Sequence, residues 1–292
     1  MDKTHAFLNP ARKLVDEVVD WLCGGAGYPG RIRRGADGVH SLAHILLVVP
    51  TAQSGRNVRL ALARRAQEKG WGGILPPLVR MPDLLLQPAG ARVATEAEEL
   101  AVYAELLRQI DLHAFPALFP NVPEERTLDW ALDTARTILG IYPILGEKGL
   151  LMREVACPED AARWKDLAAL EERFLAAFSA RGVWPRCRAR REAAEAGCVE
   201  PDIEEIVLPS AVDVSGVFTD YLAHSDCAVT LLLHANPEEA GKFDAWGRPQ
   251  GDFAASLSPG AIHPSPTPLE EADAIAAHFA AVAPSEALPA LV

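Results

Sequence analysis

The side chains best suited to chemistry in this sequence follow an apolar run near the N-terminus. Residues 45–49 are continuously apolar, and Thr51, Gln53, Ser54 and Arg56 come directly after them. Hydroxyl, amide and guanidinium groups are the groups that hold phosphate oxygens. If a helix begins in this stretch, its free backbone N–H groups add to the attraction for an anion. The stretch therefore predicts contacts with a phosphate group.

The same stretch has the outline of a phosphate-binding loop, which is a buried strand, a short turn and a helix. A P-loop also needs glycines that let backbone N–H groups surround phosphates, then Lys and Ser or Thr for the terminal phosphate and Mg²⁺. The turn from Pro50 to Arg56 has one glycine and no Gly-Lys-Ser/Thr. The upstream connection over residues 24–38 has no such motif either. We therefore expect no ATP chemistry.

Other reactive residues form no recognisable metal or catalytic site. The five cysteines have no paired spacing and are predicted to be reduced thiols. The paired acids Glu204-Glu205 and Glu238-Glu239 could bind a metal, but solvated strand and turn edges explain them more simply. The sequence therefore predicts no metal, no cofactor and no catalytic residue in this chain. Whether the chain is part of an enzyme stays open.

Composition limits the possible partners. The chain has 292 residues and a net charge of -12, which argues against a protein that coats nucleic acid by general attraction. Residues 1–92, however, carry 13 Lys/Arg and 7 Asp/Glu, against 15 and 33 in the remainder. The basic excess gathers around residues 42–69, where Arg59 becomes a further candidate DNA contact. A solvated helix face explains the same charges and stays an open alternative.

The sequence also indicates whether the chain spans a membrane or carries a signal peptide. No apolar run approaches the roughly 20 residues of a membrane span. The N-terminal segment has no apolar signal core. These observations predict a cytoplasmic protein without a membrane partner.

Strand and helix patterns alternate in the first part of the chain. Residues 9–23 have the spacing of an amphipathic helix. Residues 45–49 have the composition of a strand covered on both faces, and a helix is expected from Ser54 to just before Gly70. Residues 73–82 follow as a short strand or extended segment. A strand, a helix and a strand in this order predict a parallel sheet.

A helical pattern interrupts this alternation and the alternation then resumes. Apolar stripes with helical spacing run through residues 94–197. Strands are expected again at residues 203–209 and 228–234, with a helix at 214–223 between them. The fold class expected is α/β, with the parallel sheet of a P-loop or helicase-like domain and an inserted all-helical subdomain. The expected division is a discontinuous α/β domain, 1–92 and 199–292, and a helical subdomain, 93–198.

The last part of the chain has a different composition. Residues 253–268 are rich in Ser and Pro and are expected to form a loop or linker, and a helix is expected over 269–283. The sequence then ends on residues 288–292, which have the composition of the start of a strand. Because a domain seldom ends on an unpaired apolar strand, we expect the chain to be a piece of a longer protein.

The strand ends resemble those of superfamily 1 helicases, with their polar catalytic residues missing. Residues 46–54 resemble motif Ia, a strand and a Thr-containing turn that touches single-stranded DNA. The strand expected to carry the Walker B acids ends in Pro209-Ser210, and Asp213 follows too late to hold Mg²⁺. At the next strand, His234-Ala235 replaces a Gly-Asp pair.

Together these features resemble AddB, the partner subunit of the AddAB helicase–nuclease that processes DNA double-strand breaks. The resemblance covers nearly all of the chain and is most specific at residues 243–249, which read Phe-Asp-Ala-Trp-Gly-Arg-Pro. Its other matching segments are residues 48–51 with the arginine-rich segment that follows, residues 75–79, residues 170–175 and residues 180–182.

The resemblance implies a function in recombination and DNA repair. It implies an N-terminal helicase-like half without ATPase activity that binds single-stranded DNA and docks an AddA-like helicase subunit. In that family, an ATP-dependent deoxyribonuclease, the PD-(D/E)xK nuclease and an iron–sulfur cluster lie far downstream. Neither is expected in this chain. The acidic helical block is expected to face the protein partner, because negative charge repels DNA.

Two alternatives remain at the level of the sequence. The chain could be a stand-alone α/β module that binds a small anionic ligand at the turn from Pro50 to Arg56, and a deep closed pocket there would favour this. A nucleotide hydrolase with unconventional motifs is disfavoured by the absent Lys and Asp-Glu pair. Trp246 is a candidate platform for base stacking, or an aromatic plug that locks a turn in which Arg248 pairs with Asp244.

Overall fold

The computed structural model describes residues 3–35, 38–88, 90–210, 214–251 and 265–281. The chain divides into two compact units, Met1–Pro249 and Gln250–Val292, and each is described by itself. Within the described residues, no helix has both the length and the apolar character needed to cross a membrane.

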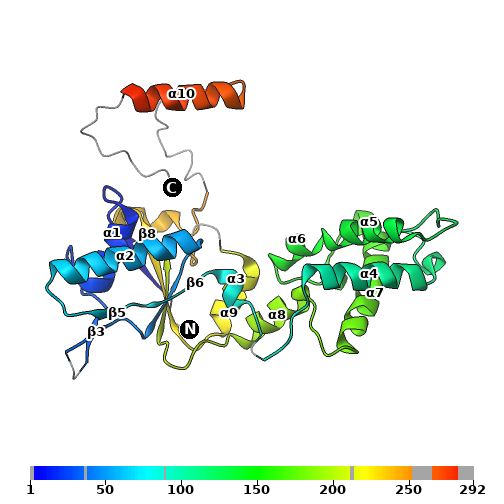
Figure 1. The fold of residues 1–292 in the computed structure, drawn as a ribbon, viewed down its shortest axis with the longest axis horizontal. Helices are drawn as coiled ribbons and strands as arrows, with labels where there is room; N and C mark the ends of the chain where they lie inside the picture. Colours follow the sequence, from blue (N-terminus) through cyan, green and yellow to red (C-terminus); the bar gives the residue numbers. More distant parts are fainter. Residues whose placement is uncertain (1–2, 36–37, 89, 211–213, 252–264, 282–292) are drawn as a thin grey trace. The chain divides into compact units, whose positions relative to one another are not determined.

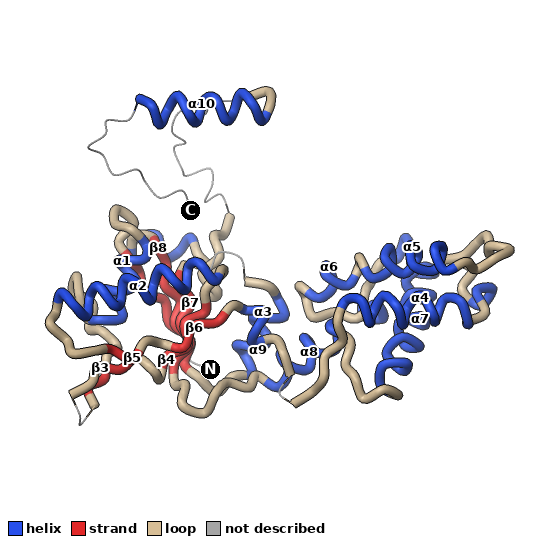
Figure 2. The backbone as a smooth tube through the Cα atoms, viewed as in Figure 1, coloured by secondary structure: helices blue, strands red, loops and turns tan. Residues whose placement is uncertain are grey.

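A five-stranded, all-parallel sheet forms the centre of the first unit (Figures 1 and 2). The mixed α/β class and the parallel sheet predicted from the sequence are therefore confirmed. The strands lie in the order β1 (Lys3–Leu8), β8 (Ala228–His234), β7 (Glu205–Pro209), β4 (Ile45–Val48) and β6 (Leu78–Arg80).

Strand β1 is absent from the sequence prediction, which places only a helix near this point. The strand lies at the edge of the sheet and pairs only with β8. Lys3, Thr4 and His5 are exposed, and Leu8 alone is fully buried. Because an edge strand needs no continuous apolar run, composition does not reveal it.

Helices cover both faces of the sheet, which explains why its central strands are almost wholly apolar. On one face, α1 (Leu14–Cys23) and α2 (Ala52–Glu68) pack against side chains from all five strands (Figure 1). On the other face, α9 (Gly216–His224) provides most of the cover, with α3 (Pro82–Leu85) beside it. The buried residues of the α1/α2 face include Leu8, Val18, Leu22, Ile45, Leu47, Val58, Leu62, Val207 and Leu232.

A second, small sheet extends this region. Strand β3 (His40–Ser41) pairs with β2 (Arg33–Arg34) in antiparallel and with β5 (Ile74–Leu75) in parallel orientation. The segment predicted as a short strand or extended segment over residues 73–82 contains two strands, β5 and β6, in different sheets. Pro76 and Pro77 separate them, because proline cannot donate a ladder hydrogen bond.

Residues 94–197 form mainly helices, as their apolar stripes predict. These are α4 (Glu96–Gln109), α5 (Leu128–Leu139), α6 (Tyr142–Gly146), α7 (Ala161–Ser179) and α8 (Arg186–Ala196). Short 3-10 helices lie at Leu112–Ala114, Met152–Glu154 and Pro158–Asp160.

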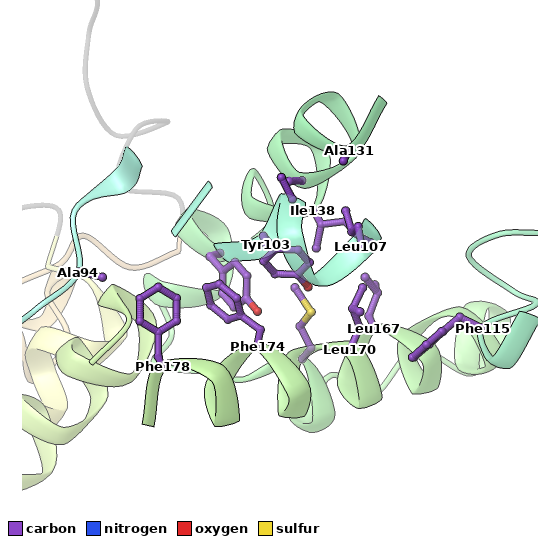
Figure 3. Packing of buried hydrophobic residues seen from close by; sticks show 14 of the residues in the cluster. Ala94, Tyr103, Leu107, Phe115, Ala131, Ile138, Leu167, Leu170, Phe174 and Phe178 are labelled. Carbon is purple, nitrogen blue, oxygen red and sulfur yellow. The ribbon is translucent and has the colours of Figure 1, made fainter. Parts of the chain in front are cut away.

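The first four of these helices enclose a hydrophobic cluster of their own (Figure 3). Tyr103 and Phe174 lie near its centre with ring centroids 4.6 Å apart, and the Phe178 ring centroid lies 5.0 Å from that of Phe174. The first compact unit contains this helical block together with the sheet, so the division at residues 93–198 stays a prediction.

Helix α8 connects the helical block to the sheet region. Ala194 of α8 belongs to the same hydrophobic cluster as Phe218 and Leu222 of α9. The helix ends at Gly197, which has a φ of +54°. A Cβ there would lie 2.5 Å from the carbonyl carbon of His224, so only glycine permits this close contact.

In the second unit the structure describes one helix, α10 (Pro268–Ala281). The Thr267 side chain accepts a hydrogen bond from the backbone N–H of Glu270 at 3.3 Å and so caps its first turn. Most of the loop predicted over residues 253–268 and the strand predicted at 288–292 lie outside the described residues.

Candidate nucleic-acid interface

The predicted turn lies at the carboxyl edge of the parallel sheet, beside a topological switch point. The chain leaves β4 towards β6 and leaves the adjacent strand β7 towards β8, in opposite directions along the sheet. In parallel sheets, ligands bind at such points. Thr51 follows β4 and Ser210 follows β7, with Ser210 in a left-handed conformation at φ +49°. Asp213 lies outside the described residues.

Thr51 is the N-cap of α2. It has the extended conformation of an N-cap, with φ -138° and ψ 155°, and its Oγ1 accepts a hydrogen bond from the backbone N–H of Ser54 at 3.1 Å. The two hydroxyl oxygens lie 2.9 Å apart. The sequence prediction that the helix begins near Ser54 is thus corrected by one turn, because the Thr51 hydroxyl takes the capping role.

Three polar side chains form an exposed cluster on the first turns of α2. Gln53 donates to the Asn57 amide oxygen at 2.9 Å, and Arg56 Nε donates to the Gln53 amide oxygen at 3.1 Å. Arg56 and Arg59 are exposed, and neither forms an ion pair within the described part of the chain. The first turn of α2 contains no acidic residue. The cluster therefore carries uncompensated positive charge beside free backbone N–H groups.

Gly55 places this cluster close to the sheet. A Cβ at Gly55 would lie 2.8 Å from Val79 Cγ1 and 3.6 Å from Val49 Cγ2. The glycine therefore lets α2 approach β4 and β6 more closely than any other residue would. Its role in this turn is helix packing, and it does not form a loop around phosphate.

A second strand–turn–helix connection leaves the same edge of the sheet, and its polar groups face one another. In this β1–α1 junction, residues 9–20, the Glu17 carboxylate is fully buried. It accepts hydrogen bonds from the Asn9 backbone N–H at 3.0 Å and the Tyr28 hydroxyl at 2.6 Å, and it pairs with Arg12. Burial is the main cause that raises the pKa of Tyr28 to about 12, and the hydrogen bond to Glu17 adds to it.

Asp20 extends this network on the next turn of α1. Its carboxylate pairs with Arg12 at 2.9 Å and with Arg65 of α2. Burial raises the pKa of Asp20, but the hydrogen bonds from Arg65 and Arg12 outweigh it, so the pKa lies below its usual range. The Glu17 carboxylate thus already occupies the start of α1, where an anion would otherwise bind.

The six candidate DNA contacts are not all brought together. Thr51, Gln53, Ser54, Arg56 and Arg59 lie on the first two turns of α2. Trp246 instead packs beside β1, with Lys3 Nζ 4.1 Å from its ring centroid. Strands β1 and β4 are separated by three strand spacings, roughly 14 Å.

The surroundings of Trp246 favour a structural role. Arg248 Nε donates to the Asp244 carboxylate at 2.8 Å, and the backbone N–H groups of Trp246 and Arg248 donate to the same carboxylate. The half-buried indole packs against the hydrophobic cluster of the α9 face. With Lys3 over the ring, we expect little access for a base.

Two cavities lie away from the turn. One, of about 270 Å³, is lined by residues of α4, α6 and α8, among them Tyr142 and Arg190. The other, of about 490 Å³, lies around Trp164. None of their lining residues belongs to the turn from Pro50 to Arg56, so these cavities do not favour the small-anion alternative. In the part of the chain that the structure describes, no three His, Cys, Asp or Glu residues gather as a metal site.

Sequence reasoning missed the network around Glu17. The segment was interpreted only as an amphipathic helix, yet the signal is visible: Glu17 lies three residues after Leu14 and four before Trp21, on the apolar face. A carboxylate at such a position needs partners. Arg12 and Tyr28 come from loops, whose positions no periodicity gives. The sequence matches no protein-family model and no curated protein.

Proposed function

We propose that this chain is the helicase-like part of an AddB-like subunit of a DNA-break-repair helicase–nuclease. In this proposal it binds the backbone of single-stranded DNA at residues 50–59 and does not hydrolyse ATP. The observation that carries the proposal is the contrast at one sheet edge. The turn after β4 presents uncompensated cations, whereas the junction after β1 is filled by buried carboxylates.

The order of elements supports the finer fold assignment. Strands β6 and β7 both pair with β4, although the whole helical block lies between them in the sequence. A parallel sheet interrupted by helices and then resumed is the organisation that the helicase resemblance implies. We therefore assign the sheet to a P-loop-type, helicase-like domain with an inserted helical subdomain.

The first turns of α2 have the chemistry of a backbone contact. Helix N-terminal N–H groups, hydroxyls and guanidinium groups all bind phosphate without reading sequence. Arg56 and Arg59 are three residues apart and so lie on one face of the helix. Since a single-stranded backbone carries one charge per nucleotide, two successive phosphates would neutralise this pair.

The acidic part of the chain is suited to a protein partner, the AddA-like motor of the proposal. Residues 199–292 carry 15 Asp/Glu and only 2 Lys/Arg, whereas the helical block, residues 93–198, carries 18 and 13. The acidic excess expected of the helical block thus lies mostly after it. We place the docking of the motor partner on this later part, because its charge would repel DNA.

Salt dependence of binding tests the DNA contact. We would measure the affinity of the intact chain for a fluorescent dT20 oligonucleotide by anisotropy from 50 to 300 mM salt. The double variant Arg56→Ala/Arg59→Ala is expected to weaken binding and to lower the slope of log K against log salt by about 1.4, about 0.7 for each lost phosphate contact.

A charge-matched variant separates a site from general attraction. In Arg108→Ala/Arg136→Ala, both arginines are exposed and pair with acids on their own helices. This variant should leave the slope unchanged. Equal losses in the two double variants, or no loss in either, would contradict the proposal, as would ATP hydrolysis by the chain.

A further inference from the structure

We propose a second contact for single-stranded DNA, in the groove around Trp164 in the helical block. One base stacks on the Trp164 indole, and the adjoining phosphates meet Arg153 and Lys165. This inference rests on the proposed function, because binding of single-stranded DNA is what brings a strand to the groove.

The groove lies where two short 3-10 helices meet the start of α7. It has a volume of about 490 Å³, and its apolar lining includes Val155 and Pro158 beside Trp164. That volume falls in the range of about 300–1,000 Å³ that holds a small molecule or a nucleotide. The groove is therefore large enough for one base and its sugar.

Trp164 differs from the other tryptophans in its surroundings. It is half-buried against the core of the helical block, and within the described residues no ring or cation covers its indole. Each of the other five tryptophans has such a partner: Arg31 on Trp21, His40 on Trp71, Phe119 on Trp130, Arg188 on Trp184 and Lys3 on Trp246. An open aromatic face is what a stacking platform requires.

The charges around the groove favour an anionic occupant. None of the residues that line it is acidic, and Arg153 and Lys165 are exposed without an ion pair in the described part of the chain. Of the neighbouring acids, Glu159 and Glu172 have no ion pair or hydrogen bond there. The others are engaged: Glu154 with Arg191 at 2.7 Å, Asp160 with Arg163 at 3.6 Å, and Asp166 with the Ala117 backbone N–H at 2.9 Å.

An indole beside two cations that form no ion pair is the combination that binds single strands without sequence preference. Stacking on an aromatic ring accepts any base, and the cations follow the backbone. A free nucleotide shares this chemistry. We commit to the strand because the interface proposed on α2, which binds single-stranded DNA in the proposed function, belongs to the same compact unit as the helical block.

Removing the base and the indole separately tests the stacking. We would compare dT20 with an oligonucleotide of the same length whose sugars carry no bases, binding each to the wild type, Trp164→Ala and Trp164→Phe. In Trp164→Ala, dT20 is expected to bind about 5- to 150-fold more weakly, since one stacked base contributes this much. The affinity of Trp164→Ala for the baseless strand should equal that of the wild type. Trp164→Phe should retain most of the wild-type affinity for dT20.

The variants Arg153→Ala and Lys165→Ala keep the test decisive if Trp164→Ala fails to fold. Their double variant should lower the salt slope by about 1.4. If dT20 binds wild type and all groove variants equally, the groove contact is overturned, while a loss in Arg56→Ala/Arg59→Ala still supports the α2 interface. If thymidine monophosphate binds as tightly as dT20, the groove holds a nucleotide and the strand is overturned.

Discussion

Two junctions leave the same edge of the same sheet, and they differ in what their polar groups face. After β1, Glu17 and Asp20 turn inward and engage Arg12, Arg65 and the loop backbone. After β4, the polar groups on the first turns of α2 point to solvent. Both junctions begin a helix next to a parallel strand, so the geometry alone does not separate them.

The difference lies in the charge of the first helical turn. Helix α1 has Asp16 and Glu17 there, whereas α2 has no acid. An acid at a helix start offsets the positive end of the helix dipole from within the chain. A helix start without one is left to bind an anion from outside. The comparison predicts which junction is sensitive to mutation for stability and which for binding.

The largest effect is expected at Glu17. In Glu17→Ala, the half-buried Tyr28 hydroxyl and the Asn9 backbone N–H lose their acceptor and the exposed Arg12 loses its ion pair, so the free energy of unfolding should fall by about 2–4 kcal/mol. Urea unfolding followed by circular dichroism measures this. The neighbouring Asp16 is exposed, and Asp16→Ala should change stability by less than about 0.5 kcal/mol. Equal effects would show that the junction is not held by the buried carboxylate.

Asp20 adds a pH dependence to the same junction. Asp20→Asn removes two charged contacts and should destabilise the protein by about 1–3 kcal/mol at pH 7. Because the pKa of Asp20 is lower in the folded than in the unfolded protein, its stabilisation is complete above the unfolded pKa, about 3.9. It is lost as the pH falls through the lower folded value. The gap between wild type and variant in urea unfolding should therefore shrink below about pH 4, and a gap independent of pH would contradict this origin.

At the junction after β4, the substitution with the largest expected effect on stability is Gly55→Ala. The new methyl group would overlap Val79 Cγ1 at 2.8 Å and push α2 from the sheet. We expect a loss of about 1–2 kcal/mol, since overpacking exceeds the gain in helix propensity. Gly73→Ala is the control, because no atom lies within 4 Å of its added Cβ. If Gly55→Ala is as stable as the wild type, the close contact between α2 and the sheet does not depend on this glycine.

The smallest change in stability is expected when the first turn of α2 is given an acid, as α1 has. This substitution compares the two helix starts directly. Gln53→Glu should stabilise the helix start by about 0.3–1 kcal/mol through the helix dipole. It should at the same time weaken binding of dT20, because the carboxylate neutralises Arg56. Gln67→Glu, near the end of α2, carries the same charge change and should leave binding unaltered. Stability and affinity that change in the same direction would contradict the proposed opposition.

Much of the architecture can be predicted from the sequence, because burial imposes a regular pattern of apolar residues along each helix and strand. The apolar runs at β4, β7 and β8 predict strands covered on both faces, and the stripes of α4, α5 and α7 predict a helical core. Most residues of the proposed α2 interface are also visible, since Thr51, Gln53, Ser54 and Arg56 fall within six residues of sequence. Strand β1 is not, because an edge strand with three exposed polar residues shows no such pattern.

Only the tertiary structure decides which of these polar groups are free. The sequence shows an arginine-rich helix, but Arg65 is paired with Asp20 across 45 residues, whereas Arg56 and Arg59 on the same helix are unpaired in the described residues. Likewise, all six tryptophans look alike in composition, and only the fold covers five and leaves Trp164 open. The physical reason is that periodicity records burial along one element, while charge pairing and ring stacking join residues that are distant in sequence.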